Sequence, residues 1–278
     1  MTLVTIIIII IYICRKIINM KIAVLYICTG RYNQFFADFY KSAKKYFLKE
    51  IADIEYFVFT DDEQLCSNPD VHIIRKRCKG FPLDSLMRFD NFLSIKEQLL
   101  CFDYTFFFNA NMKFVAPIGL DFLPVKEGLS AVIHPGYYNK PAFLYPYERN
   151  KKSTAYIRPF GKDYHYFMGS LNGGKAKDFM KLSEVCSKNI HEDLKNGIIA
   201  IFHDESHLNK YLRKNKCLMY TPSYAYQEGI NIPYSKKIIL IDKVKVNKYF
   251  NKEKYSSFFL KVIIKGSAII YKSISWYL

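Results

Sequence analysis

The sequence predicts a single α/β domain. Short apolar runs, typical of buried strands, alternate along the chain with segments whose apolar residues recur every three or four positions, as in helices. The first predicted strand, helix and strand together have the length of a βαβ crossover. The chain has 278 residues, of which 50% are hydrophobic, and this is enough for one domain with a large core.

The predicted strands in the first half of the chain are apolar runs that end at a polar residue; they cover residues 21–28, 54–60, 71–74 and 104–108. Between them, apolar side chains return at helical spacing in residues 35–47 and 83–100, which predicts two helices. The last of these strands stops at Asn109-Ala110-Asn111. In open α/β sheets ligands collect beyond the carboxyl ends of the strands, so this stop is a candidate ligand site.

The second half of the chain contains fewer strand-like runs. A further strand is expected over 130–133, after which Pro and Tyr dominate as far as Gly161 and predict a long ordered loop of the kind that binds ligands. Strand character returns over 164–171 and is broken by Gly173-Gly174. The last two predicted helices have apolar residues at helical spacing; they cover residues 175–195 and 206–214.

Two terminal segments differ from the predicted domain, which spans residues 21–248. Residues 1–19 include six consecutive isoleucines followed by two basic residues. This run is shorter than the ~20 apolar residues of a membrane span, so it is either a marginal anchor or an extension upstream of a translation start at Met20. Residues 249–278 alternate lysines with large apolar residues, which is typical either of a helix in an anionic membrane interface or of a terminal helix packed on the domain.

Charge and cysteine content restrict the partners and the compartment. The 41 Lys and Arg residues exceed the 25 Asp and Glu residues, and the net charge of +16 favours nucleic acid, anionic lipid or phosphorylated small molecules as partners. The lysines are dispersed and no nucleic-acid-binding motif is present, so nucleic acid is not expected. The 7 cysteines are an odd number without C-x-x-C spacing, which argues against a disulfide framework or a zinc ribbon and predicts a reducing, cytoplasmic location.

The Asn109-Ala110-Asn111 turn is informative because it lacks carboxylates. Nucleotide-sugar enzymes commonly place Asp-x-Asp at such a strand end, where two carboxylates hold a divalent cation that bridges the donor diphosphate. Asparagine oxygens are neutral and bind a hard cation poorly without a carboxylate beside them. Taken alone, the motif is two asparagines in an ordinary turn.

A second polar cluster is His203-Asp204-Glu205-Ser206-His207, which follows the apolar residues 198–202. Histidines four apart on a helix can bind zinc together, but the order is not H-E-x-x-H and no third ligand is evident. The segment can also be a helix start, with Asp204 as the cap and Glu205 in the first turn. A helix start can present a catalytic carboxylate to a pocket, so these last two interpretations are compatible.

Several motifs together resemble glycosyltransferase family 6, which includes the histo-blood-group A and B transferases, the α-1,3-galactosyltransferases and bacterial relatives. They occur in order along most of the chain: LYICTGRYNQFFADFYKSA (25–43), HPGYYNK (134–140), YERN (147–150), TAYI (154–157), FMGSLNGG (167–174) and HDESHLNKYL (203–212). The resemblance implies a GT-A type nucleotide-sugar transferase fold, a single domain with a central twisted mixed sheet flanked by helices. Vertebrate members have Asp-x-Asp and use manganese. The bacterial branch is similar to this chain in having Asn-x-Asn, which implies that no metal or other cofactor is needed.

The resemblance also implies a set of site residues. The UDP-sugar donor would contact the residues at family donor positions: Ile27, Cys28, Thr29, Tyr32, Asn109, Asn111, Met168, Gly169 and Ser170. The acceptor would contact His134, Phe202 and Glu205, and Phe81 stands near another position where the family has tryptophan. Glu205 would be the nucleophile or would stabilise the oxocarbenium-like transition state. Asp204 would orient donor hydroxyls, and Arg88 would offset charge near the donor.

The implied activity is retaining transfer of galactose or N-acetylgalactosamine from a UDP-sugar to a β-galactoside, in α linkage and by the family pattern α-1,3. The acceptor would be an oligosaccharide or glycolipid, fucosylated ones included, at the cytoplasmic face of the membrane. A bulky Met168 and a Ser170 larger than glycine leave less room at C2 of the donor sugar, which favours galactose. The loss of Asp-x-Asp leaves a second hypothesis, an inactive glycan- or nucleotide-binding module on the same fold, which the intact Asp204 and Glu205 oppose.

Overall fold

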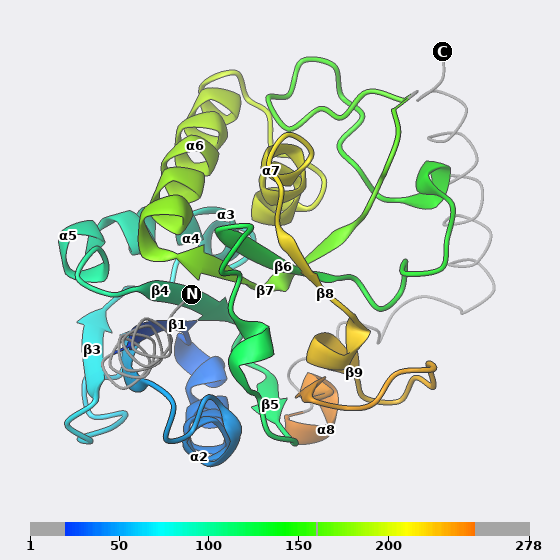
Figure 1. The fold of residues 1–278 in the computed structure, drawn as a ribbon. Coiled ribbons are helices and arrows are strands. Elements are labelled where there is room, and N and C mark those ends of the chain that lie inside the picture. Colours follow the sequence, from blue (N-terminus) through cyan, green and yellow to red (C-terminus); the bar gives the residue numbers. More distant parts are fainter. Residues whose placement is uncertain (1–19, 160, 248–278) are drawn as a thin grey trace, which may run out of the picture.

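Seven strands form the central sheet of the computed structural model, which describes residues 20–159 and 161–247 (Figure 1). In chain order they are β1 (Lys21–Ile27), β2 (Asp53–Thr60), β3 (Val71–Arg75), β4 (Tyr104–Phe108), β6 (Leu129–Ile133), β7 (Phe167–Lys175) and β8 (Leu218–Tyr220). Across the sheet the order is β3-β2-β1-β4-β7-β6-β8. Only β7 runs antiparallel to its neighbours in this sheet. The predicted α/β class with a mixed central sheet is therefore confirmed.

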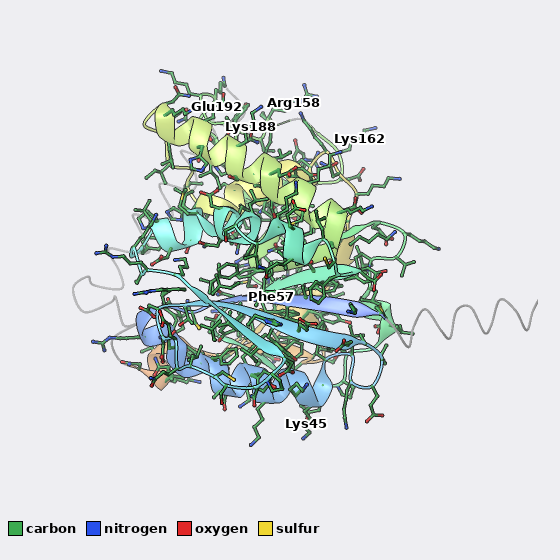
Figure 2. All side chains as sticks on the ribbon, turned by 90° about the vertical axis from the view of Figure 1, so that its left-hand side faces the viewer. Lys45, Phe57, Arg158, Lys162, Lys188 and Glu192 are labelled. Atoms are coloured by element: carbon green, nitrogen blue, oxygen red, sulfur yellow. The ribbon has the colours of Figure 1, made fainter. Side chains whose placement is uncertain are left out.

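Helices cover both faces of the sheet, as the two views in Figure 1 and Figure 2 show. One face carries the 3₁₀ helix η1 (Gly30–Phe35) and helix α2 (Phe36–Tyr46). The other face is covered by helices from both halves of the chain: α4 (Arg88–Leu93), α6 (Ala176–Lys195) and α7 (His203–Leu212). In Figure 2, Phe57 lies at the level of the sheet, whereas Lys45 and Lys188 lie on the outer surfaces of α2 and α6.

Strand β1 is buried on both faces because its side chains alternate between two hydrophobic cores. Val24 and Tyr26 belong to the core under α2, together with Phe39 of that helix. Ala23 and Leu25 belong to the core under α4, α6 and α7. A continuous apolar run is what such a two-sided strand requires, which explains why the sequence predicted it correctly.

The predicted helix over 83–100 is wrong as a single element. The structure has three short helices there: α3 (Leu83–Leu86), α4 and α5 (Lys96–Leu99). Leu86, Phe89 and Phe92 recur every three residues. In an unbroken α-helix, side chains three residues apart point in directions that differ by about 60°, so such a series leaves one face of the helix. The break at Met87 separates Leu86 from the two phenylalanines of α4, and all three side chains lie in the core.

Gly173-Gly174 does not break a strand, contrary to the prediction, but lies inside β7. A Cβ on Gly173 would stand 2.4 Å from the carbonyl oxygen of Thr105, and one on Gly174 would stand 2.1 Å from that of Gly128. The two glycines therefore allow neighbouring backbones to approach closely. Strand β7 also begins later than predicted, at Phe167.

The long loop that precedes β7 is ordered, as expected, and contains the 3₁₀ helix η3 (Ala142–Leu144). Tyrosine side chains pack together into a small separate core that includes Tyr145, Tyr147 and Tyr166. Asp193 of α6 fastens the loop from the other side, because its carboxylate accepts hydrogen bonds from the Ser153 hydroxyl (2.5 Å) and the Thr154 N–H (2.7 Å). The loop is thus held against helix α6.

A second, three-stranded sheet was not predicted. It joins β5 (Met112–Phe114), β9 (Tyr226–Gln227) and β10 (Ile238–Leu240), with β10 in the centre. The short helices η2 (Leu120–Phe122), η4 (Pro222–Ala225) and α8 (Lys243–Val246) complete the described elements. This small sheet brings α8 beside the carboxyl end of β4, although the two are distant in sequence.

None of the helices within residues 20–159 and 161–247 is both long and apolar enough to span a bilayer. The expectations for residues 1–19 and 249–278 fall outside the described residues and stay predictions.

Candidate active site

A pocket of about 680 Å³ lies where the carboxyl ends of β1 and β4 meet the amino end of β7. These ends share one edge of the sheet because β7 runs antiparallel to β4. Helix α7 contributes its first turn to the wall. Most of the predicted site residues line the pocket: Ile27, Thr29, Tyr32, Arg88, Asn109, Met168, Gly169, Ser170, Phe202, Asp204 and Glu205.

Three predicted residues do not line this pocket: Cys28, Asn111 and His134. Cys28 is fully buried in the core under α2, and burial raises the pKa of its thiol to about 12. It therefore contributes packing and no direct contact with the pocket.

His134 is partly exposed and lies outside the pocket lining, against Tyr166. Its backbone N–H donates to the Tyr166 carbonyl oxygen (2.9 Å), and the two rings are 5.8 Å apart. The Gly136 N–H donates to Nδ1 (2.9 Å), so the neutral imidazole carries its proton on Nε2. Burial lowers the pKa of His134 to about 4, which keeps the ring neutral at physiological pH.

The Arg88 guanidinium lies between Asp204 and strand β7. It forms an ion pair with the Asp204 carboxylate and donates to the Gly169 carbonyl oxygen (2.6 Å), and both charged side chains are buried. Burial raises the pKa of Asp204, and the positive charge of Arg88 opposes this rise. Asp204 is thus occupied by Arg88 and held in one orientation.

Glu205 has different partners from Asp204, although the two residues are adjacent. The Tyr166 hydroxyl donates to Oε1 (2.5 Å), and the Gly169 N–H donates to Oε2 (2.6 Å). Burial raises the pKa of Glu205 to about 7, and these hydrogen bonds oppose the rise. A carboxylate fixed at both oxygens at the wall of a pocket, with a pKa near neutrality, is typical of a reactive group.

Helix α7 begins at His203, and Asp204 is not its cap. Phe202 occupies the position before the helix, and its N–H donates to the Ser206 hydroxyl (3.0 Å). The two histidines contact different elements: the His203 ring packs against Phe81, with ring centroids 4.8 Å apart, and His207 lies 3.7 Å from Asp193. No group of three or more His, Cys, Asp or Glu side chains in the described part of the chain is arranged to hold a metal ion.

The two asparagines of the Asn109-Ala110-Asn111 turn have different surroundings. Asn109 lines the pocket, and its side-chain amide donates to the Asn111 side-chain oxygen (3.0 Å). Asn111 is buried, and its amide donates to the carbonyl oxygen of Ile241 (2.8 Å), whose N–H donates back to the Asn111 backbone (2.8 Å). Asn111 therefore anchors the segment that leads into α8.

Lys243 is the first residue of α8 and lines the pocket beside Tyr32. Its ammonium group lies 3.3 Å from the Tyr32 hydroxyl oxygen and 5.0 Å from the centre of that ring. Sequence reasoning named no individual lysine, because this residue reaches the pocket only through the unpredicted sheet of β5, β9 and β10. Its charge joins those of Arg31 and Arg88 in the lining.

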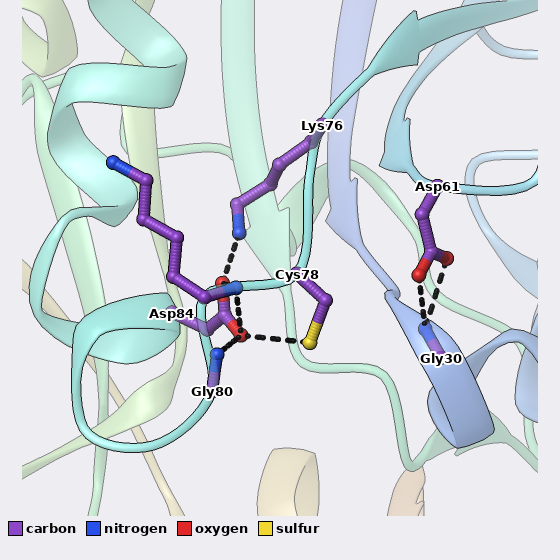
Figure 3. A network of polar contacts seen from close by, with 7 residues as sticks. Gly30, Asp61, Lys76, Cys78, Gly80 and Asp84 are labelled. Atoms are coloured by element: carbon purple, nitrogen blue, oxygen red, sulfur yellow. Dashed lines mark hydrogen bonds and ion pairs between the residues drawn. The ribbon is translucent and has the colours of Figure 1, made fainter.

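Two aspartates hold the loops at the mouth of the pocket (Figure 3). Both carboxylate oxygens of Asp61 accept from the Gly30 N–H, at 2.9 and 3.0 Å. Asp84 pairs with Lys76 and accepts from the Gly80 N–H (2.7 Å) and from the Cys78 thiol (3.3 Å). The loop ordered by Asp84 carries Phe81, whose side chain is 69% exposed beside the pocket.

Comparison with known proteins identifies the family. The sequence profile of glycosyltransferase family 6 matches residues 9–253. The chain is 39% identical over 239 residues to the O-antigen biosynthesis glycosyltransferase WbnI of Escherichia coli, covering 84% of this chain and 100% of that protein. It is 30% identical over 225 residues to globoside alpha-1,3-N-acetylgalactosaminyltransferase 1 of Gallus gallus, covering 76% of this chain and 63% of the relative.

A shorter match, 36% identical over 129 residues, covers 46% of this chain and 37% of histo-blood group ABO system transferase 2 of Rattus norvegicus. The profile match covers all of the described residues, including every element that surrounds the pocket. The chain therefore belongs to glycosyltransferase family 6.

Proposed function

We propose that this glycosyltransferase moves galactose or N-acetylgalactosamine from a UDP-sugar, with retention and without a metal ion, onto a β-galactoside. The linkage would be α-1,3, and fucosylated acceptors are included. The observation that carries the proposal is the doubly hydrogen-bonded Glu205 carboxylate in a pocket shared with Asn109 and Lys243. The name of the chicken relative supports N-acetylgalactosamine as a candidate sugar and the α-1,3 linkage.

The donor would lie along the edge of the sheet. The uridine would contact Ile27, Thr29 and Tyr32, and the sugar would contact the first residues of β7. Ser170 lines the pocket at this point. Met168 and Ser170 also narrow the space at C2, which favours galactose.

The charge of the departing UDP would be offset by basic side chains in place of a cation. Lys243 is the best placed, because it lines the pocket close to Tyr32. Its helix, α8, contains no acidic residue that could neutralise its charge. Asn109 offers a neutral amide, and Asn111 is committed to Ile241. A charge-assisted hydrogen bond from an ammonium group to a diphosphate is the stabilisation that such a site requires.

Glu205 would act at the anomeric carbon of the donor sugar. The bond from this carbon to the UDP oxygen breaks, and a bond to the acceptor hydroxyl oxygen forms on the same face. The acceptor proton leaves with the UDP. An ionised Glu205 serves both retaining routes, since it either bonds to the anomeric carbon between two inversions or stabilises positive charge during same-face attack.

The acceptor would approach past the exposed rings of Phe81 and Phe202, which flank the mouth of the pocket. Apolar sugar faces stack on such rings. The E. coli relative is named for O-antigen biosynthesis, which supports a surface glycan as the final product. All six cysteines in the described residues are free, which supports a reducing, cytoplasmic compartment.

The test is transfer from UDP-galactose and UDP-N-acetylgalactosamine to plain and fucosylated β-galactosides, by the wild type and by Glu205→Gln. We expect Glu205→Gln to lose about 10²- to 10³-fold in kcat and to keep its fold, because a neutral amide cannot replace the negative charge. Glu192→Gln, on the exposed surface of α6, is the control and should keep full activity. A binding module would show no transfer by the wild type, and this result would refute the proposal.

A further inference from the structure

Tyr166 directly precedes β7 and reaches Glu205 from behind the pocket wall. Its side chain is 2% exposed and does not line the pocket, yet its hydroxyl donates to Oε1 of Glu205 at 2.5 Å. It stands just outside the FMGSLNGG motif, so motif matching gave it no role. A buried phenol aimed at the proposed reactive carboxylate calls for an explanation beyond packing.

The Tyr166 ring is held from several sides by the small tyrosine core. Its centroid lies 5.2 Å from that of Tyr137, 5.6 Å from that of Tyr147 and 5.8 Å from that of His134. The Tyr166 carbonyl oxygen also accepts from the His134 N–H (2.9 Å). A ring fixed in this way presents its hydroxyl without loss of side-chain entropy during the reaction.

The Tyr166 hydroxyl and the Gly169 N–H donate to different oxygens of the Glu205 carboxylate. Two donors on two oxygens fix the plane of the carboxylate as well as its position. The hydrogen bond to Oε2 comes from a backbone N–H, which a change of side chain leaves in place. The hydrogen bond to Oε1 comes from the Tyr166 hydroxyl, which a single substitution removes.

We propose that Tyr166 is a positioning residue for sugar transfer, whose hydroxyl keeps the Glu205 carboxylate ionised and oriented toward the donor. The inference rests on the proposed function, in which an ionised Glu205 faces the anomeric carbon. It adds a residue to the site that touches neither donor nor acceptor and that acts only through Glu205.

The expected direction of its effect follows from the surroundings of Glu205. Burial and the neighbouring Asp204 raise the pKa of Glu205, whereas Tyr166, Gly169 and Arg88 lower it. The other titratable groups close by are His203, ahead of Glu205 on α7, and Tyr137, in the small tyrosine core. A hydrogen bond to the charged form favours that form, so loss of the Tyr166 hydroxyl should raise the pKa of Glu205 further.

The test compares Tyr166→Phe with Tyr147→Phe. Tyr147 is a matched control, because it belongs to the same tyrosine core and its buried hydroxyl donates to the His165 backbone oxygen (2.7 Å), not to Glu205. The Glu205 carboxyl is titrated directly by ¹³C NMR on glutamate-labelled protein, with Glu205→Gln identifying the resonance. Tyr166→Phe should shift the midpoint upward by about one pH unit, and Tyr147→Phe should leave it in place.

Kinetics supply a second readout. Because one unit in pKa is tenfold in the ionised fraction, kcat of Tyr166→Phe should fall about tenfold at pH 6 and recover above pH 8. The donor KM should stay within about twofold of the wild type, since Tyr166 does not line the pocket. A loss of activity that is equal at every pH would indicate a merely structural role and would overturn the inference.

The outcomes also separate this inference from the proposed function. If the wild type transfers no sugar, the proposed function fails, but the Glu205 midpoint in Tyr166→Phe still decides whether Tyr166 sets its ionisation. An unchanged midpoint overturns the inference whatever the activity. If Tyr166→Phe does not fold, the ¹³C signal of the Tyr166 ring carbon that bears the hydroxyl is followed in the wild type instead. This signal must change with pH at the Glu205 midpoint. A signal that does not change there overturns the inference.

Discussion

Asp204 and Glu205 are adjacent in sequence and chemically alike, yet their surroundings give them different properties. Asp204 pairs with Arg88, whereas Glu205 accepts hydrogen bonds from Tyr166 and from the backbone of Gly169. Successive helical residues point about 100° apart, so each acid meets a different neighbour. The sequence indicated that both acids belong to the site, but the partners that distinguish them come from other elements.

Lys243 tests the charge balance of the site at the scale of one residue. We expect Lys243→Ala to lower kcat/KM about ten- to hundredfold, because a charge-assisted hydrogen bond to the donor diphosphate is lost. Lys245→Ala is the control, since Lys245 lies on the same short helix and is exposed near Glu228.

Wild-type transfer should persist in excess chelator. Strict dependence on manganese would contradict this assignment.

At the scale of elements, the site is assembled from one edge of the central sheet and from pieces that the sequence did not reveal. Long apolar strands such as β1 and β4 were predicted because both of their faces are buried. Strands β5, β9 and β10 have only two or three residues each and pair across a large sequence separation, so no local periodicity indicates them. The position of Lys243 was therefore beyond sequence reasoning, whereas the strand ends that line the pocket were within it.

The Asp84 loop carries a prediction at this scale. Asp84→Asn keeps the shape of the side chain but removes the charge that pairs with Lys76, and so weakens the loop that carries Phe81. The acceptor KM should rise about three- to tenfold, as expected for loss of an ordered aromatic contact, with little change in kcat. Asp62→Asn, on the neighbouring exposed turn, should behave as the wild type. Equal acceptor KM values for both variants would show that the loop does not contact the acceptor.

At the scale of the whole molecule, burial of the site has a cost in stability. Burial of Glu205 at the wall of the pocket raises its pKa from an ordinary 4.5 to about 7. The native state then holds a proton that the unfolded state has lost between these pH values, and stability falls as pH rises through this window. The chain has 41 basic and 25 acidic residues, and this excess of positive charge is suited to binding anionic substrates.

The pH dependence of unfolding measures this cost. Glu205→Gln has no proton to lose at this position, so its advantage in free energy of unfolding over the wild type should grow by about 2 to 3 kcal/mol from pH 5 to pH 8. Urea titrations of both proteins at the two pH values provide the comparison. A difference that stays constant with pH would mean that Glu205 is already ionised at pH 5.

The central claim is that Glu205 faces the anomeric carbon of a UDP-sugar bound across the ends of β1, β4 and β7. The most direct measurement is a crystal structure of Glu205→Gln with intact UDP-galactose. We predict the uracil beside Ile27 and Tyr32, the diphosphate within hydrogen-bond reach of Lys243, and the anomeric carbon about 3 to 3.5 Å from the side chain at position 205. A sugar bound away from this side chain, or a nucleotide in another part of the molecule, would contradict the account.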